Sequence, residues 1–329
     1  MRGIFSGLAA ALLVACSADL PQNTLAPAGE NARIISDLFA WIFWWALGVF
    51  VVVEALLVYT VIRFRRRSEQ ALPPQTHGHT QLEIAWTIAP AIVLALIAVP
   101  TVQALGQLSE PPSQQPLQVE VIAHQWWWEF HYPELGVVTA NELHVPVGTV
   151  VTTRLKSADV LHSFWIPRLA GKLDIIPGRT NTMWFNANEA GVYLGQCAEL
   201  CGLSHALMKF RVIAQSNEEF EGWVRDQKAV PPAPTGPAAS GAQLFVSPQK
   251  LCATCHTVAG TEAKAQVGPN LTHVGSRTTI AAGVLENTPE NMARWLRDPV
   301  AVKPGSKMPK LPLSEQDVSA LVGYLQSLR

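Results

Sequence analysis

The chain has 329 residues, of which 49% are hydrophobic and only 15% are charged, and its formal net charge at pH 7 is −1. This composition is too apolar for one ordinary soluble domain, and the net charge is too close to zero for a nucleic-acid-binding protein. The length predicts two or three modules.

The first segment, MRGIFSGLAAALLVAC, is typical of a secretory signal. It has Arg2 as its basic start, then an apolar run, and then small residues up to Cys16. The final letters LVAC also resemble the bacterial lipoprotein signal, in which the cysteine is lipidated and becomes the new N-terminus. An ordinary signal peptide with an incidental cysteine is the alternative. We expect a lipoprotein-type signal at residues 1–15, lipid on Cys16 and a periplasmic segment at residues 16–37.

Two long apolar segments follow, at residues 38–62 and 84–105. Each is long enough to span a bilayer, which takes about 20 residues. The basic run RFRRR directly after the first segment marks a cytoplasmic end, so the chain begins on the outer side. We therefore predict a transmembrane helical hairpin at residues 38–106, with everything after it on the periplasmic or outer, oxidising side.

Glu54 interrupts the first apolar segment. A carboxylate in hydrocarbon is costly unless it faces protein or water. We expect Glu54 to contact a neighbouring helix of another subunit, because nothing else in this chain could pair with it.

After residue 106 the periodicity becomes that of strands. LQVEVIAHQWWWEF and HALMKFRVI alternate between apolar and polar residues, and GTVVTTRLKS is rich in β-branched residues. We expect an all-β Greek-key sandwich or barrel at residues 107–228. AVPPAPTGPAAS, at residues 229–240, predicts a semi-extended linker to a second small domain.

Three consecutive tryptophans fall within the first of these stretches. On one strand they would point alternately to its two faces, so we expect Trp126 and Trp128 on one face and Trp127 on the other. Core packing would explain Trp127 without any function.

The segment GQCAELCGLSHALMKF gathers soft metal ligands. Cys197 and Cys201 are four residues apart, and the further candidates are His205, Met208 and, upstream in DVLHSFW, His162. One thiolate, two imidazoles and a weak thioether would make a mononuclear blue-copper site. The second thiolate is best used by bridging to a second copper, so that each metal keeps one histidine and one weak ligand. Such a rigid core would rearrange little when an electron arrives or leaves, which suits electron transfer.

Two other structures would use the same residues. A Cys197–Cys201 disulfide would suit the oxidising compartment, but it would close a very small ring and leave His205 and Met208 unexplained. A zinc site of two cysteines and two histidines has no use for methionine, which is a soft ligand suited to copper.

CATCH, at residues 252–256, has the pattern of a haem c attachment sequence. In this pattern the two thiols, here Cys252 and Cys255, add to haem vinyl groups, and the histidine, here His256, becomes an axial iron ligand. VGPNL offers the Pro269 carbonyl to the imidazole, and KMPKL offers Met308 as the distal thioether.

The surrounding pattern is that of a class I cytochrome c. Met292 is the rival distal ligand, but ENMARWLRD predicts an amphipathic helix around it. A final helix should begin at Ser314, with Asp317 completing a capping box. We expect an all-α cytochrome c domain at residues 241–329.

DVLHSFWIPRLAGKLDIIPGR and GVYLGQCAELCGLSHALMKFRVI together resemble the copper-A domain of subunit II of cytochrome c oxidase, a haem-copper terminal oxidase. LEIAWTIAPAIVLALIAVPT is similar to the second membrane helix of that family, and AHQWWWEFHYP to its aromatic stretch. The resemblance implies a cupredoxin-like fold with two copper ions. The implied ligands are His162, Cys197, the backbone carbonyl of Glu199, Cys201, His205 and Met208.

The same resemblance implies roles for four more groups. The Glu199 carboxylate would hold a magnesium ion shared with subunit I, and Asp159 would belong to the acidic patch that faces cytochrome c. Trp126 would be the electron relay into the copper pair; the tyrosine common at the middle of the trio is Trp127 here. Glu83 would lie at the mouth of a proton-uptake channel into subunit I, although a plain interface carboxylate is the alternative.

Together these expectations describe the electron-input subunit of a proton-pumping cytochrome c oxidase in a bacterial inner membrane. One covalent haem c would pass electrons to the copper pair, which would pass them to haem a of subunit I for the reduction of oxygen to water. The expected partners are subunits I and III, the lipid membrane, and an external cytochrome c or a quinol:cytochrome c reductase as donor, with no nucleic acid.

Two alternatives are other redox enzymes, nitrous oxide reductase and nitric oxide reductase, and a third belongs to a different class. Nitrous oxide reductase would need a large histidine-rich copper-sulfide domain, which nine scattered histidines cannot supply. The copper-A subunit of a nitric oxide reductase and a membrane-anchored electron carrier or copper-handling module outside any oxidase stay open.

Overall fold

The computed structural model describes residues 20–65 and 77–329. The predicted signal peptide and the lipid position Cys16 lie outside the described residues. The described chain divides into two compact units, one of residues 33–110 and one made of all the others. The predicted fold class of two long apolar helices, an all-β domain and a helical C-terminal domain is confirmed.

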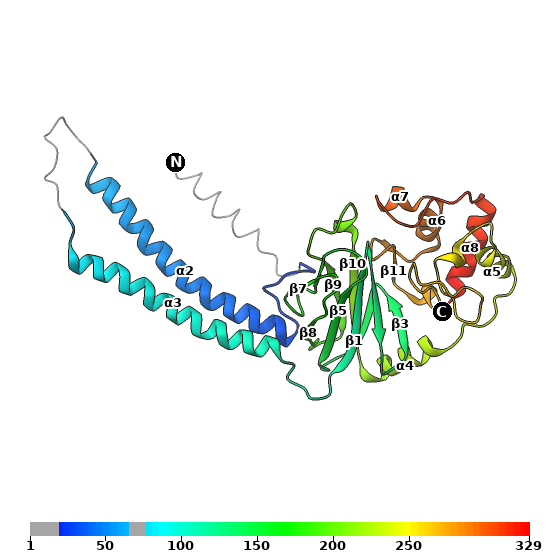
Figure 1. Cartoon of the computed structure of the whole chain (residues 1–329), viewed down its shortest axis with the longest axis horizontal. Coiled ribbons are helices and arrows are strands. Elements are labelled where there is room, and N and C mark those ends of the chain that lie inside the picture. The colour runs from blue at the N-terminus through cyan, green and yellow to red at the C-terminus, as the bar shows by residue number, and fades with distance from the viewer. Residues whose placement is uncertain (1–19, 66–76) are drawn as a thin grey trace, which may run out of the picture. The chain divides into compact units, whose positions relative to one another are not determined.

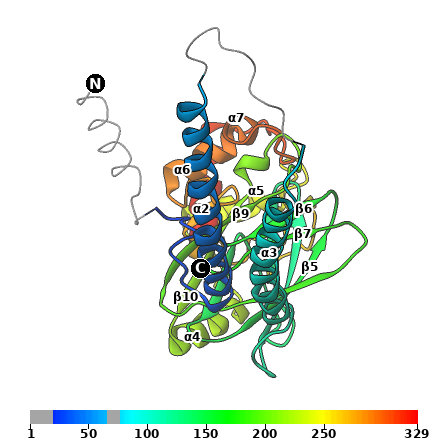
Figure 2. The same ribbon diagram turned by 90° about the vertical axis from the view of Figure 1, so that its left-hand side faces the viewer.

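The unit of residues 33–110 is a pair of long helices, α2 (Glu30–Arg63) and α3 (Thr80–Ser109). They lie side by side in both views (Figures 1 and 2). Each contains its predicted apolar segment and is long and apolar enough to cross a membrane. Trp41 Nε1 donates to the Leu96 carbonyl at 3.1 Å and ties the two helices together.

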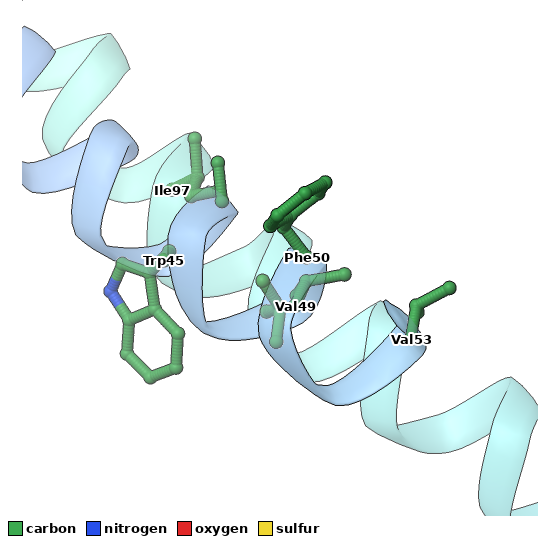
Figure 3. Close-up of a pocket in the computed structure, with 7 residues that line it drawn as sticks. Trp45, Val49, Phe50, Val53 and Ile97 are labelled. Atoms are coloured by element: carbon green, nitrogen blue, oxygen red, sulfur yellow. The ribbon is translucent and has the colours of Figure 1, made fainter. Parts of the chain in front are cut away.

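An open apolar groove of about 400 Å³ lies on this helix pair (Figure 3). Its lining consists of Trp45, Ala46, Val49, Phe50, Val53, Val93 and Ile97. An exposed apolar face of this kind is stable only against lipid tails or against helices of another chain. Glu54 follows Val53 directly and is exposed, so its expected contact with another subunit stays a prediction.

Residues 117–215 form a sandwich of two five-stranded sheets, with the strand orders β3-β2-β1-β5-β8 and β4-β10-β9-β6-β7. The strands are β1 (Leu117–His124), β2 (Trp127–Tyr132), β3 (Val137–Ala140), β4 (Glu142–Pro146), β5 (Val151–Ser157), β6 (His162–Trp165), β7 (Lys172–Ile175), β8 (Asn181–Phe185), β9 (Gly191–Cys197) and β10 (Lys209–Gln215). The pairs β1–β5 and β4–β10 are parallel, and the other pairs within the sandwich are antiparallel. The chain therefore crosses repeatedly between the sheets.

Alternation along the strands fills the core of the sandwich. Val119, Val121 and Ala123 are buried on β1, while the residues between them are only half-buried. The Trp128 ring meets the rings of Phe164 and Phe210 edge-on, with ring centres 5.4 and 5.2 Å away. These three residues come from both sheets, so aromatic packing joins the two layers.

The prediction that the three tryptophans share one strand is wrong. β1 ends at His124 and β2 begins at Trp127, with Gln125 and Trp126 in the turn between them. Trp128 points into the core as a strand residue, whereas the position of Trp126 is set by the turn. Strand alternation therefore does not govern Trp126.

A helix and a short linker follow the sandwich. α4 (Asn217–Lys228) begins with a capping box in which Ser216 and Glu219 bond each other's backbone N–H. α5 (Pro237–Val246) already starts inside the predicted linker, because proline is well suited to the first turn of a helix. Within the predicted linker, residues 229–236 lie outside any helix or strand.

The C-terminal domain packs short helices around α8. Its elements after α5 are the turns η2 (Cys252–Thr254) and η3 (Val274–Ser276), the strands β11 (Thr279–Ile280) and β12 (Leu285–Glu286), and the helices α6 (Pro289–Arg297), α7 (Pro299–Val302) and α8 (Glu315–Ser327). The predicted capping box of Ser314 and Asp317 at the start of α8 is confirmed. α5 crosses α8 closely at Gly241. A Cβ added at this glycine would overlap the Ala320 carbonyl group.

We expect Gly241→Ala to lower the free energy of unfolding of this domain by about 1–3 kcal/mol, because the added methyl group overpacks the crossing of α5 and α8. Denaturant unfolding followed by far-UV circular dichroism measures the change. Gly323→Ala on α8 is the matched control: nothing lies within 4 Å of its added Cβ. The control should stabilise the helix by about 0.5–1 kcal/mol. Equal effects of the two substitutions would contradict the close crossing.

Candidate metal and haem sites

Strand ends at one edge of the sandwich position the predicted copper ligands. His162 opens β6 and Cys197 closes β9, and these two strands are paired neighbours. The chain then turns through Cys201 and a short 3₁₀ turn, η1, that starts at His205, and reaches Met208 directly before β10. One loop between adjacent strands thus supplies every predicted ligand except His162.

The two thiols lie close together without forming a bond. Their sulfur atoms are 3.7 Å apart, far beyond the ~2.05 Å of a disulfide. Both cysteines are free and buried. The ligand atoms of His162, Cys197 and Cys201 all lie within 4.8 Å of one another. The site is therefore shaped for a metal rather than for a disulfide.

Each sulfur has one imidazole and one weaker donor beside it. Cys197 Sγ lies 3.8 Å from His162 Nδ1 and 3.2 Å from the Glu199 carbonyl oxygen. Cys201 Sγ lies 3.7 Å from His205 Nδ1 and 3.9 Å from Met208 Sδ. This even division of donors fits two copper ions bridged by two thiolates, and it uses the methionine that a zinc site would leave over.

The electrostatics of the thiol pair call for a cation. The hydrogen bond from the Cys201 thiol holds the pKa of Cys197 well below that of a free thiol. The neighbouring Cys197 sulfur in turn raises the pKa of Cys201. The first proton is therefore lost more easily than the second, and a metal cation between the sulfurs would favour the loss of both.

Asp159 orients the His162 imidazole. Its Oδ1 lies 2.8 Å from His162 Nε2, which leaves Nδ1 facing the sulfurs. Its Oδ2 accepts from the Gln125 amide at 2.7 Å. Burial alone would raise the pKa of Asp159, but these hydrogen bonds lower it, so the carboxylate stays ionised. This residue was expected only to face cytochrome c, and the structure adds the contact with a predicted ligand.

Trp126 is bonded directly to the thiol loop. Its indole N–H donates to the carbonyl oxygen of Cys201 at 3.0 Å, and the Gln125 side chain donates to the same oxygen at 2.8 Å. Gly202 lets the loop approach, because a Cβ there would come within 2.9 Å of the indole. The indole thus lies against the backbone of a predicted copper ligand, as a relay requires.

The C-terminal domain surrounds a cavity of about 560 Å³, within the usual range for a ligand site. The predicted haem attachment residues Cys252, Cys255 and His256 line it, as does Met308. His256 Nδ1 lies 2.9 Å from the Pro269 carbonyl oxygen, as predicted, so Nε2 is free for iron. Burial lowers the pKa of His256, which favours the neutral imidazole that binds metals. These residues fit a covalent haem.

The two methionine candidates lie in different settings. Met292 lies on the amphipathic helix α6, is 2% exposed, and accepts a contact from Gln326 Nε2 at 3.8 Å. Met308 lies in the loop between α7 and α8 and is only half-buried. Because the Met292 sulfur is already engaged in the core, the setting of Met308 suits an axial ligand better.

The haem cavity also reaches the copper domain. Its lining includes His124 at the end of β1, Trp126 in the turn and Trp127 at the start of β2. The sequence did not predict that one turn would face both sites. It also missed Gly268, whose absent side chain makes room for the His256 ring, and Lys303, which lines the cavity beside Trp126. The glycine inside VGPNL was the available sequence signal for Gly268. No sequence pattern marked Lys303.

Two carboxylates were predicted from the resemblance to serve sites shared with another subunit. Glu83 is in the first turn of α3, where its Oε1 accepts from the His79 backbone N–H at 3.1 Å. That contact caps the helix. The Glu199 side chain is half-buried in the thiol loop, and its magnesium role stays a prediction.

Comparison with known families covers most of the chain. Family models match residues 22–104 (cytochrome c oxidase subunit II, transmembrane domain), residues 137–215 (cytochrome c oxidase subunit II, periplasmic domain) and residues 238–329 (cytochrome c). The three matches indicate copper for the β-sandwich and haem for the C-terminal domain.

Relatives match nearly the full length. Cytochrome c oxidase subunit 2 of Alkalihalophilus pseudofirmus is 40% identical over 96% of this chain and 94% of its own. The protein of the same name from Bacillus sp. strain PS3 is 40% identical over 98% and 96%. Quinol oxidase subunit 2 of Bacillus cereus is 31% identical, but over only 67% of this chain and 78% of its own.

We expect Cys197→Ser or Cys201→Ser to abolish the two-copper site rather than weaken it, leaving at most one copper, because the expected site needs both thiolates as bridges between the metals. Electron paramagnetic resonance of the copper-loaded protein measures this through the hyperfine pattern. Ser163→Ala, which changes a buried hydroxyl on β6, is the control and should keep the unmutated pattern. A pattern from one copper nucleus in the unmutated protein would rule out the bridged pair.

Proposed function

The chain belongs to the cytochrome c oxidase subunit II family, and we propose that it is the electron-input subunit of a proton-pumping cytochrome c oxidase. In this role it passes electrons from haem c to the binuclear copper-A centre and on to haem a of subunit I, where oxygen is reduced to water. The observation that carries the proposal is the position of Trp126, which borders the haem cavity and bonds the thiol loop.

In the copper domain, the proposed ligands are held in fixed positions. His162, Cys197, Cys201, His205 and Met208, with the Glu199 carbonyl, would hold two copper ions, which supply one-electron transfer. Asp159 fixes the His162 ring and the Gln125 backbone together. Little needs to move at this site when an electron passes, which keeps the cost of the transfer low.

In the C-terminal domain, four residues would hold the haem. Cys252 and Cys255 would carry the haem covalently, and His256 and Met308 would be its axial ligands. The Pro269 carbonyl fixes the His256 ring, and Gly268 leaves room for it. The family match indicates a haem, and the covalent attachment is part of this proposal.

The remaining roles depend on partner subunits. Membership of the family implies association with subunit I. We propose that the Glu199 carboxylate shares a magnesium ion with that subunit and that Glu83 lies at the mouth of one of its proton channels. Subunit III, and an external cytochrome c or a quinol:cytochrome c reductase as donor, complete the assembly. The two apolar helices would lie in a bacterial inner membrane, with the soluble domains on the periplasmic side.

A quinol oxidase is the second candidate, because relatives of that name match two thirds of the chain. The haem attachment residues favour the cytochrome c route, since a direct quinol donor would leave the C-terminal domain without a use.

We expect the complex, purified with its membrane partner, to show absorbance of haem c beside that of a second haem type and to consume oxygen with reduced cytochrome c as donor. The visible spectrum and an oxygen electrode measure both. Oxygen uptake with quinol alone would favour the second candidate, and turnover of nitric oxide in place of oxygen would favour a nitric oxide reductase. Purification without any haem-bearing membrane subunit would contradict the proposal.

If Trp126 is the relay, Trp126→Leu should slow reduction of the copper by the chain's own haem while leaving the spectra of both centres unchanged. Stopped-flow reduction of the haem, followed by the rate of copper reduction, measures this. Trp223→Leu on α4, where the indole stacks on His144, is a control that should leave the rate unchanged. An unchanged rate in Trp126→Leu would remove Trp126 from the path. A rate proportional to protein concentration would show that the donor is the haem of another molecule.

A further inference from the structure

Polar contacts hold the haem domain against the copper domain on both sides of the turn that carries Trp126. On one side, Glu142 of β4 accepts hydrogen bonds from the backbone N–H groups of Thr278 and Thr279 at 2.8 and 2.9 Å. The Glu142 side chain is 2% exposed. A buried carboxylate that receives several hydrogen bonds from one partner segment fixes the position of that segment.

On the other side, Lys303 of the haem domain is inserted against the turn. Its Nζ donates to the Trp126 carbonyl at 2.5 Å and to the Ala281 carbonyl at 3.2 Å. The residue is 4% exposed, and no carboxylate of the described chain forms an ion pair with it. Burial accordingly lowers the pKa of Lys303 to about 7.

Burying a lysine whose hydrogen-bond partners are all carbonyl oxygens costs free energy, because carbonyl oxygens offset the loss of hydration less than a paired carboxylate would. An apolar side chain of similar length would fill the same space at lower cost. The position of Lys303 is better explained by what it holds, which is the backbone of Trp126.

The residues after Lys303 cover the Trp126 indole and the thiol loop. The Ser204 hydroxyl bonds the Pro304 carbonyl, and a Cβ at Gly305 would come within 3.2 Å of the indole. Lys307 Nζ lies 3.4 Å from Asp159 Oδ2. The next residue is Met308, so one short loop joins the proposed axial haem ligand to the proposed relay.

We propose that residues 303–307 form a docking clamp that fixes the haem domain on the Trp126 turn, with Lys303 as the positioning residue for electron transfer. The inference rests on the proposed function for the transfer step, but the docking itself does not depend on any bound group. Lys303 acts through the backbone of residue 126 and touches neither predicted metal ligand set.

The test compares Lys303→Met with the unmutated complex by hydrogen–deuterium exchange mass spectrometry and by the rate of copper reduction from haem c. Methionine keeps the length of the side chain and removes its donors. We expect exchange at Thr278 and Thr279 to rise about tenfold or more. Those amides bond Glu142 of the copper domain, so faster exchange there reports loss of the contact between the two domains. Copper reduction should slow by a similar factor, with unchanged spectra.

Lys310→Met is the matched control, because Lys310 belongs to the same loop but pairs with Asp298 inside the haem domain. Lys310→Met should change neither the exchange at Thr278 and Thr279 nor the rate of copper reduction. Lys303→Arg restores donors and charge and should recover part of the protection. Glu142→Gln loosens the opposite side and should raise exchange near residue 126, which keeps the proposal testable if Lys303→Met does not fold.

Unchanged exchange and an unchanged transfer rate in both Lys303→Met and Glu142→Gln would overturn the clamp. Faster exchange without slower transfer would overturn the positioning role. Failure of the proposed function looks different, because the unmutated protein would then lack the spectra of haem c or of the copper pair.

Discussion

The copper domain depends on the approach of two thiol sulfurs to 3.7 Å inside a buried loop. Two thiolates this close repel each other, so a positive charge between them favours the loss of both protons. Everything around them fits that constraint. Paired strands fix His162 and Cys197, the loop returns through Cys201, and each sulfur meets one imidazole and one weak donor. The sandwich brings four donor types together at a single edge.

Local chemistry made much of this predictable. The spacing of Cys197 and Cys201, the C-x-x-C-H pattern and the Ser314 capping box each describe contacts within a short stretch of chain. A pattern of that kind is visible in the sequence because its residues are covalent neighbours. The apolar helices were predictable for the same reason, since a bilayer demands a long continuous run.

Contacts between distant segments were not predictable. Lys303 and Trp126 are 177 residues apart, and nothing in either local pattern marks the other. The prediction for the three consecutive tryptophans was wrong because side chains alternate between two faces only along an unbroken strand, whereas the chain turns at Gln125 and Trp126. The start of α5 inside the expected linker has a similar cause: a proline-rich composition does not distinguish an extended segment from one whose proline begins a helix.

The bond from Lys303 goes to the main-chain oxygen of residue 126, not to its indole. Every amino acid offers that oxygen, so this one bond does not depend on which side chain stands at position 126. The indole is held by separate contacts, with the Cys201 carbonyl and beside Gly305. Docking through the main chain and the proposed electron transfer through the ring thus use different atoms of one residue, and a change of ring would leave the Lys303 bond in place.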